Sequence, residues 1–350
     1  HSFPTRRSSD LPMYEIQSFP SLIEINNTVL SQTSKDLLHG LKIQHNDKWY
    51  ICGDLALNEG QLPHKLINSS PDDIDYQLLA KASILLAQDK IEQPLTITTG
   101  FPYSTYYIYR DKAVEFFKKT HLLDYDASTH NAGNKKKVVL DVQKVEVIPE
   151  IVGCTIAIRK GEPNVSGSFF VFSCGFGTFE SILSTDSGIV EQAMVSTHGI
   201  RYAVNLMINE LRSKYYLELR NVNQLDDAFQ RGYIFLNRQN VDLREIRKNV
   251  IQTYYQEVIS PNLRSIINDS NLVKTNRIYL CGGAMYYQEL VDCFIAEFGH
   301  FTEITVLDNP ETLASKGYAL NSLRVSGRPK SALGIDIGNA TTVVTNFAGE

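Results

Sequence analysis

A stretch near the end of the chain combines one acid, a glycine turn and several hydroxyl groups, which are the parts that a phosphate-binding hairpin needs. It is ALGIDIGNATTVV, residues 332–344, which reads as two short strands around a turn. Gly338 would let the backbone come close to phosphate oxygens, and Asp336 would hold water on a Mg²⁺ ion. The side chains that could donate hydrogen bonds are Asn339, Thr341 and Thr342. A plain hairpin with a surface acid is the alternative.

A second stretch, GSFFVFSCGFGTFESILS at residues 167–184, repeats this pattern. Gly175, Gly177 and Thr178 occupy the positions of the first turn, but the acid expected at the end of the first strand is replaced by Ser173. A serine can make one hydrogen bond but carries no charge. Because polyphosphates bind to backbone N–H groups, two such hairpins together favour a nucleotide site.

A third glycine turn, Gly282-Gly283, lies between a strand-like and a helix-like stretch, and a simple helix-packing turn is its alternative interpretation. From Met13 onward such stretches alternate, which predicts an α/β architecture. Among the expected elements are a helix over 110–120, a polar loop over 124–136 and a helix over 311–323.

The bulk composition is that of a globular protein long enough for two packed domains. The chain has 350 residues, of which 43% are apolar and 21% charged, and its net charge is -5. The short run Lys135-Lys136-Lys137 is expected to solvate a hairpin turn, so we expect no direct binding of nucleic acid. No apolar run approaches the about 20 residues that a membrane span requires. We therefore expect no membrane span.

The cysteines are odd in number, form no C-x-x-C pair and have apolar or glycine neighbours, which predicts reduced core residues of a cytoplasmic protein. They are Cys52, Cys154, Cys174, Cys281 and Cys293. The first residues, HSFPTRRSSDL, look like a translated sequencing adapter. Residues 1–12 are therefore set aside, and Met13 is the expected start.

Five motifs together resemble those of the superfamily that contains actin, sugar kinases and the heat-shock chaperone ATPases. They are GIDIGNATT, GFPYSTYY, VEVIPE, FSCGFGT and YLCGGA, and they match the first phosphate, linker-strand, connecting, second phosphate and adenosine motifs. Within the superfamily, WYICGDLAL, TTGFPYSTYY and VEVIPE are most similar to segments of the plasmid-segregating actins of the ParM and StbA type. The likeness covers nearly the whole of 13–350.

The resemblance implies a bilobed actin-like (ribonuclease H-like) fold, in which two related α/β domains flank a nucleotide cleft. The first part of domain I would be 13–150, domain II would be 151–304, and 305–350 would complete domain I with the first phosphate hairpin. Gly161-Glu162-Pro163 is the expected hinge.

The order of the motifs differs from that of the family, because the first phosphate hairpin comes last. The chain therefore looks circularly permuted, with RVSGRPKS (324–331) linking the family's C-terminus to its N-terminus. If so, residues 332–350 must add two strands to the sheet begun by YEIQSFPSLIEI, since otherwise the sheet keeps unpaired backbone groups. The hairpin could complete its own chain or a neighbouring one.

The resemblance also implies the activity. ATP and Mg²⁺ would be the cofactors, the hairpins and Gly282-Gly283 would bind the nucleotide, and Glu150 would be the catalytic residue that orients the attacking water. Ser173 predicts weak hydrolysis. Such proteins form filaments that separate plasmid DNA through a DNA-binding adaptor. The alternatives are a small-molecule kinase of the same superfamily and a hydrolysis-defective ATP-binding scaffold, and Glu150 could be a solvated acid at a strand end.

Overall fold

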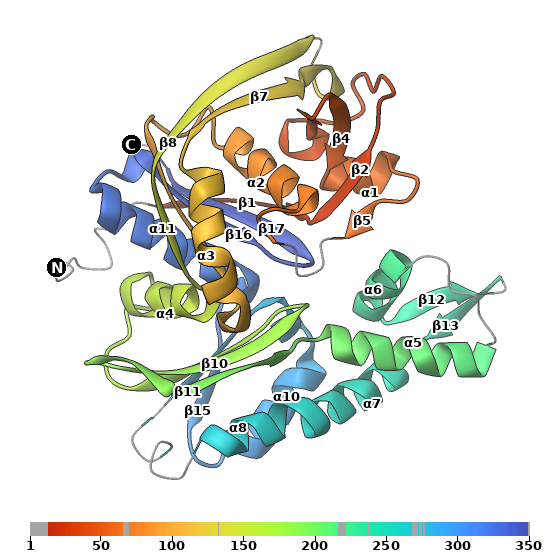
Figure 1. Cartoon of the computed structure of the whole chain (residues 1–350). Helices are drawn as coiled ribbons and strands as arrows, with labels where there is room; N and C mark the ends of the chain where they lie inside the picture. The colour runs from red at the N-terminus through yellow and green to blue at the C-terminus, as the bar shows by residue number, and fades with distance from the viewer. Residues whose placement is uncertain are drawn as a thin grey trace. The chain divides into compact units, whose positions relative to one another are not determined.

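The chain folds into two compact α/β units (Figure 1). The computed structural model describes residues 13–348 except 66–69, 132, 216–221, 237, 268–271, 273–274 and 276, so the predicted adapter segment 1–12 lies outside the described residues. Unit 1 contains the described residues up to Ser166 and those from Thr312 onward, and unit 2 contains Gly167–Glu311. The predicted α/β class is confirmed.

Unit 1 is built on a ten-stranded sheet with the order β1-β17-β16-β6-β8-β7-β3-β4-β2-β5. The strands are β1 (Tyr14–Pro20), β2 (Leu22–Ile25), β3 (Lys42–His45), β4 (Lys48–Cys52), β5 (His64–Lys65), β6 (Leu95–Phe101), β7 (Thr120–Asp126), β8 (Lys135–Pro149), β16 (Ala332–Ile337) and β17 (Thr341–Phe347). β16, β6 and β8 run parallel to one another, so their carboxyl ends meet at one edge of the sheet.

The late hairpin completes this sheet within the same chain. β17 pairs antiparallel with β16 on one side and with β1 on the other, in a register that runs from Tyr14 opposite Phe347 to Pro20 opposite Thr341. The predicted addition of two strands to the sheet is therefore confirmed. β1 is the edge strand on this side of the sheet, and β16 is hydrogen-bonded to β6 on its other side. Circular permutation, as the origin of this order of motifs, stays a prediction.

Helices cover both faces of the unit 1 sheet. They are α1 (Asp54–Glu59), α2 (Ile74–Leu86), α3 (Tyr103–Phe117), α4 (Glu150–Lys160) and α11 (Leu313–Ser326). Leu333 and Ile335 of β16 join the core that contains the buried face of α2. The residue between them, Gly334, faces α11, where an added Cβ would lie 2.2 Å from the Ser315 carbonyl oxygen. Side chains alternate along a strand, so Asp336 lies on the α11 side.

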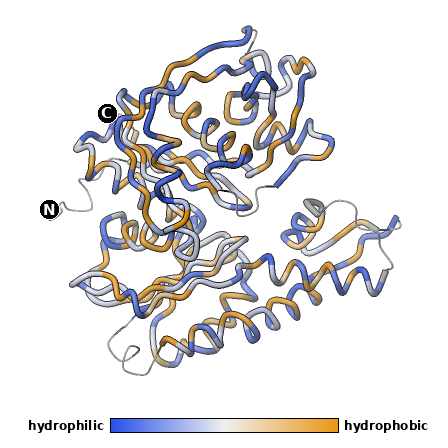
Figure 2. The backbone as a smooth tube through the Cα atoms, in the orientation of Figure 1, coloured by the Kyte–Doolittle hydropathy of each residue, from blue (hydrophilic) through white to orange (hydrophobic). Residues whose placement is uncertain are grey.

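Two sequence expectations for unit 1 are corrected by its structure. The expected linker at 324 begins later, because α11 continues to Ser326 and ends at Gly327 in the left-handed conformation that glycine favours at a helix end. The expected loop over 124–136 is shorter, because β7 extends to Asp126 and the three lysines start β8, paired with β7. Figure 2 shows this start of β8 as hydrophilic, and its three lysines are exposed on the strand rather than part of a turn.

Unit 2 is built on a five-stranded sheet with the order β11-β10-β9-β14-β15 and a separate two-stranded hairpin. The strands are β9 (Phe169–Cys174), β10 (Thr178–Thr185), β11 (Gly188–His198), β12 (Tyr233–Leu236), β13 (Gln239–Asp242), β14 (Arg277–Cys281) and β15 (Glu303–Val306). The helices are α5 (Arg201–Tyr215), α6 (Val222–Arg231), α7 (Arg244–Tyr254), α8 (Ser260–Ile266) and α10 (Gln288–Phe298). A π-helical turn, Tyr255–Ile259, joins α7 to α8.

One face of the unit 2 sheet packs on these helices. Phe172 and Cys174 of β9 and Phe179 of β10 belong to the same core as the buried residues of α5, α7 and α10. Because strand residues alternate, Ser173 and Glu180 project from the opposite face. The packing of the core thus fixes which side of the sheet carries these polar side chains.

The cysteines lie mostly in the core, as their neighbours predict. All five cysteines are free, and four of them are buried, with Cys293 half-buried. Among the described residues, no helix combines the length and hydropathy needed to cross a membrane.

Candidate functional site

Two carboxylates meet at the carboxyl edge of the unit 1 sheet. Asp336 is the penultimate residue of β16, and Glu150 begins α4 directly after Pro149, the last residue of β8. β6 lies between these two strands, and its Phe101 is paired with Pro149. The parallel arrangement therefore brings together two acids that are 186 positions apart in the sequence.

Both acids have a raised pKa, and Glu150 contributes to that of Asp336. Desolvation, and then the charge of Glu150, raise the pKa of Asp336 well above its usual value. Desolvation raises the pKa of Glu150 from 4.5 to about 7. Like charges held in a desolvated place do not both ionise readily. The pair therefore retains a proton near neutral pH, and a divalent cation beside it would favour the ionised form of both.

In the first glycine turn, between β16 and β17, two carbonyl groups accept hydrogen bonds from the same serine. The Ser21 amide donates to the Ala340 carbonyl at 2.9 Å, and the Ser21 hydroxyl donates to the Gly338 carbonyl at 2.6 Å. The same hydroxyl lies 2.9 Å from the Thr342 hydroxyl. The Gly338 amide closes the turn with a bond to the Thr341 carbonyl. These carbonyl groups of the turn are therefore already hydrogen-bonded within the protein.

The predicted ligands of this turn are placed unequally. Asp336, Gly338, Asn339 and Thr341 are half-buried, whereas Thr342 is fully buried with its hydroxyl on Ser21. Sequence reasoning missed Ser21. Its role depends on contacts between residues 317 positions apart, for which a local pattern carries no signal.

In the second glycine turn, between β9 and β10, the carbonyl groups accept hydrogen bonds from backbone amides rather than from a side chain. The amides of Gly199, Ile200 and Arg201, at the start of α5, donate to the carbonyls of Gly177, Gly175 and Phe176 respectively, at 3.0 to 3.1 Å. The Gly175 amide closes this turn with a bond to the Thr178 carbonyl at 2.9 Å, as the Gly338 amide does in the first turn.

Gly199 is required by this contact and was also missed by sequence reasoning. A Cβ at that position would lie 2.6 Å from the Gly175 carbonyl oxygen and 2.6 Å from the Thr178 nitrogen. At Gly175 itself, an added Cβ would meet nothing closer than the Thr178 carbonyl oxygen at 3.6 Å. The turn is packed closely on its α5 side, while its Gly175 position leaves room for a ligand.

The Gly282-Gly283 turn packs against this second hairpin. Gly282 has a positive φ of 89°, and a Cβ there would lie 2.3 Å from the Cys174 carbonyl oxygen, at the end of β9. Gly283 is exposed, and the nearest atom to an added Cβ would be the Glu311 Cβ at 3.9 Å. Unit 2 therefore brings this turn next to the strand that carries Ser173, and Gly283 leaves its backbone accessible.

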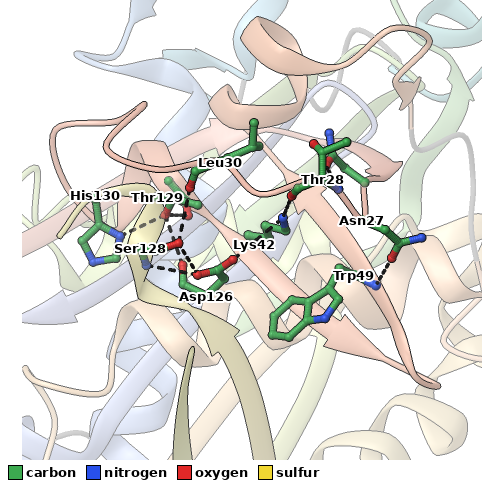
Figure 3. Close-up of polar contacts among 11 residues, drawn as sticks. Asn27, Thr28, Leu30, Lys42, Trp49, Asp126, Ser128, Thr129 and His130 are labelled. Carbon is green, nitrogen blue, oxygen red and sulfur yellow. Dashed lines mark hydrogen bonds and ion pairs between the residues drawn. The ribbon is translucent and has the colours of Figure 1, made fainter. Parts of the chain in front are cut away.

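A separate cavity of about 570 Å³ lies in unit 1, between the start of β8 and the segment that follows β2. Figure 3 shows the polar contacts beside it. Asp126 lines the cavity and is buried, and it accepts hydrogen bonds from the Ser128 hydroxyl and amide and pairs with the Lys42 ammonium at 3.8 Å. Lys42 also donates to the Thr28 carbonyl. This network is satisfied internally, and none of the predicted site residues belongs to it.

The donor set fits Mg²⁺ in one respect. Within the described parts of the chain, no three His, Cys, Asp or Glu side chains are grouped so that they could enclose a metal ion. Mg²⁺ in nucleotide sites is commonly held by one or two carboxylates together with water and phosphate oxygens. The pair Asp336 and Glu150 fits that requirement, whereas it would not suit a metal that needs a closed set of protein ligands.

One family model matches the first part of the chain. Residues 5–153 match the model of the actin-like proteins' N-terminal domain. These residues are similar to that domain, and they make up less than half of the chain. The match begins within 1–12, and it ends in α4 just after Glu150.

Solved structures show that most of the chain has an actin-like fold. A non-polymerisable quadruple mutant of pCBH ParM is 17% identical, with 88% of this chain and 92% of that chain covered and a TM-score of 0.70. ParM in a 15-stranded filament from Clostridium botulinum is 19% identical over 87% and 92%, with a TM-score of 0.69. The archaeal actin homologue Ta0583 in complex with ADP is 14% identical over 87% and 92%, with a TM-score of 0.63. No curated protein sequence matches the chain.

Proposed function

We propose that this actin-like protein binds ATP with Mg²⁺, assembles into filaments and hydrolyses ATP to turn the filaments over. The observation that carries the proposal is the pair of desolvated carboxylates, Asp336 and Glu150, beside a glycine turn on an actin-like fold. Burying two acids together costs free energy unless a cation or a shared proton compensates them. A structural role alone gives no reason to place them at the carboxyl edge of a parallel sheet, where ligands commonly bind.

The two hairpins would bind the phosphates through backbone amides, since their carbonyls are engaged by Ser21 and by the start of α5. In unit 1 the binding residues would be Asp336, Gly338, Asn339, Thr341 and Thr342. In unit 2 they would be Ser173, Gly175, Gly177, Thr178, Gly282 and Gly283. Asp336 would hold Mg²⁺ through water, which neutralises the charge on the phosphates.

Glu150 would orient the attacking water. In hydrolysis the water oxygen bonds to the γ-phosphorus, the bond from that phosphorus to the β,γ-bridging oxygen breaks, and a water proton passes to a carboxylate. The raised pKa of Glu150, about 7, lies near neutral pH, where a general base is most effective. ATP is thereby converted into ADP and phosphate.

The filament part of the proposal is supported by the structural neighbours. One similar structure is a ParM filament and another is a ParM variant made non-polymerisable, so polymerisation belongs to proteins of this fold. We propose plasmid or DNA segregation in the cytoplasm as the role. Because the net charge is -5, a DNA-binding adaptor protein rather than this chain would contact DNA.

Sedimentation together with phosphate release tests the proposal. The wild-type chain should pellet with Mg²⁺ and ATP and release phosphate, and EDTA should prevent both. Glu150→Gln should pellet with Mg²⁺ and ATP but release phosphate at least about 100-fold more slowly, the range expected when a general base is lost. A wild-type chain that binds ATP without pelleting would contradict filament formation. Phosphate transfer that requires an added sugar would instead identify a kinase, and binding without hydrolysis a scaffold.

A further inference from the structure

Unit 1 contains a group of basic side chains that has no acidic partner. Its members are Lys81 of α2, His45 of β3, His121 of β7 and Lys119, directly before β7. The two histidines share their strand faces with Ile43 and Leu123, which pack in the same core as α2. Within the described part of the chain, none of the four basic groups forms an ion pair with a carboxylate.

A hydrogen bond joins two members of this group. The Lys81 Nζ and the His45 Nδ1 lie 2.7 Å apart. Such a contact needs a proton on one nitrogen and a lone pair on the other, and an ammonium group has no lone pair. One proton therefore lies between the two nitrogens. When that proton is on His45, Lys81 is a neutral amine, which is a nucleophile.

The surroundings favour the uncharged form of Lys81. Desolvation, and then the charge of Lys119, lower the pKa of Lys81. Desolvation, and then the charge of Lys81, lower the pKa of His45. Desolvation also lowers the pKa of His121, whose ring donates a hydrogen bond to the Phe117 carbonyl at 2.9 Å. A lysine that is removed from water and lies beside other cations is the kind that reacts as an amine.

Lys81 is also the accessible member of its part of α2. Between Leu78 and Leu86, Lys81 is half-buried while every other residue is buried. His45 is 9% exposed and His121 is 3% exposed. A small reactant suits this half-buried amine better than a bulky one. A product with a negative charge would be attracted by the basic groups around it.

We propose that Lys81 reacts reversibly with CO₂ to form a carbamate, and that His45 accepts the lysine proton. The Lys81 Nζ passes one proton to the His45 Nδ1, and its lone pair bonds to the carbon of CO₂. One carbon–oxygen double bond of CO₂ opens to give the carboxylate, and a second proton leaves Nζ for water. Nothing is oxidised or reduced. The carbamate then pairs with the protonated His45 and supplies the acid that the group lacks.

Trapping the carbamate tests the inference without any variant. The wild-type chain is incubated with isotope-labelled bicarbonate and treated with triethyloxonium ion, which converts a carbamate into a stable ethyl ester, and peptide mass spectrometry locates the label. Occupancy at Lys81 should exceed that at Lys112 about tenfold or more, since each unit by which a pKa falls raises the fraction of neutral amine about tenfold. Lys112 is the matched comparison, because its hydrogen bond to Asp72 raises its pKa. Without bicarbonate, neither lysine should carry the label.

Two variants test the roles of the pair. Lys81→Arg keeps the positive charge and should remove the carbamate resonance of this site from the carbon NMR spectrum, whereas Lys112→Arg should keep it. His45→Gln still offers Lys81 an acceptor but cannot take its proton. It should lower the occupancy at Lys81 about tenfold, because the charge-assisted bond between imidazolium and carbamate is lost.

Two results would overturn the inference. In the first, Lys81 of the wild type carries no more label than Lys112, and this result holds whether or not the variants fold. In the second, His45→Gln melts at the wild-type temperature and keeps the full occupancy at Lys81, which would remove His45 from the reaction. Neither measurement uses a nucleotide, so the inference does not depend on the proposed function.

Discussion

The two glycine hairpins have the same turn but are supported differently. In unit 1 the turn carbonyls are held by the amide and hydroxyl of a single residue, Ser21, whereas in unit 2 they are held by three backbone amides at the start of α5. A side chain can be replaced by mutation while a backbone amide cannot. The second hairpin therefore depends on close approach of the chain at Gly199, and the first depends on one hydroxyl group.

Their carboxylates differ in the same way. Asp336 lies on the first strand of its hairpin and is close enough to Glu150 for their charges to interact, whereas the acid of the second hairpin, Glu180, lies on the second strand. The two units thus share the hydrogen bonding of the turn but carry an acid on different strands beside it.

The largest expected effect comes from removing the acid of the first hairpin. Asp336→Ala should abolish the Mg²⁺-dependent stabilisation by ATP in a melting experiment and weaken Mg·ATP binding about 100-fold, because hydrogen bonds to charged groups are worth roughly 1.5 to 3 kcal/mol. Ser173→Ala, at the equivalent position of the second hairpin, should have a much smaller effect. An unchanged ATP-induced shift in Asp336→Ala would remove Asp336 from the site.

The second effect is a dependence of the free energy of unfolding on pH, which comes from the acids beside the first hairpin. The folded-state pKa of Glu150 is raised, so the unfolded chain releases its proton first and the folded chain loses stability as pH rises from 4.5 to about 7. At 1.36 kcal/mol per pKa unit, the loss amounts to about 3 kcal/mol.

Urea unfolding without nucleotide, at pH 5 and at pH 7.5, measures this loss. Glu150→Gln should reduce the difference between the two pH values, and Asp336→Asn/Glu150→Gln should remove most of it, because desolvation also raises the pKa of Asp336. Saturating Mg·ATP should also reduce it, because the cation favours the ionised acids. If Asp336→Asn/Glu150→Gln leaves the pH dependence intact, the acid pair is not its source.

The third effect concerns the support of the second hairpin. Gly199→Ala should lower the free energy of unfolding by about 1 to 3 kcal/mol, the usual cost of overpacking, because its Cβ would collide with backbone atoms that cannot rotate away. Gly283→Ala is the matched control for stability, since its Cβ would have only an ordinary contact with Glu311. Chemical denaturation of both variants measures the difference, and equal stability would contradict the close packing at Gly199.

The smallest effect concerns the support of the first hairpin. Ser21→Ala removes the hydroxyl that holds the Gly338 carbonyl but keeps the backbone bond to Ala340, so it should cost about 1 to 2 kcal/mol of unfolding free energy. Ser18→Ala on the same strand is exposed and should cost almost nothing. A Ser21→Ala protein as stable as Ser18→Ala would show that the hydroxyl does not support the turn.

Local patterns were enough to predict the hairpins, because a glycine turn between two apolar strands is encoded within about fifteen adjacent residues. The start of α3 was missed, although Pro102 directly before Tyr103 is a usual signal of a helix N-terminus. The helix was expected only from Arg110. The predicted polar loop is too long because Asp124, Asp126 and the three lysines are strand residues, although charged residues are more common in solvated turns.

The rest of the site depends on register and on distant contacts. Glu180 could have been found by counting outward from the turn, since pairing Gly175 with Thr178 places Ser173 opposite Glu180. Ser21 could not, because it reaches the turn only when β1 pairs with β17. The desolvation that raises the pKa of Glu150 likewise follows from packing, to which no single segment of the sequence contributes alone.

Binding of ATP to the wild-type chain, measured by titration with and without Mg²⁺, tests the central claim most directly. The account predicts saturable binding at one site per chain that weakens by about tenfold or more when EDTA removes the cation, since the acids are then left without their partner. Binding that is equally tight with EDTA, or no binding at millimolar ATP, would contradict a nucleotide site formed by Asp336, Glu150 and the two glycine hairpins.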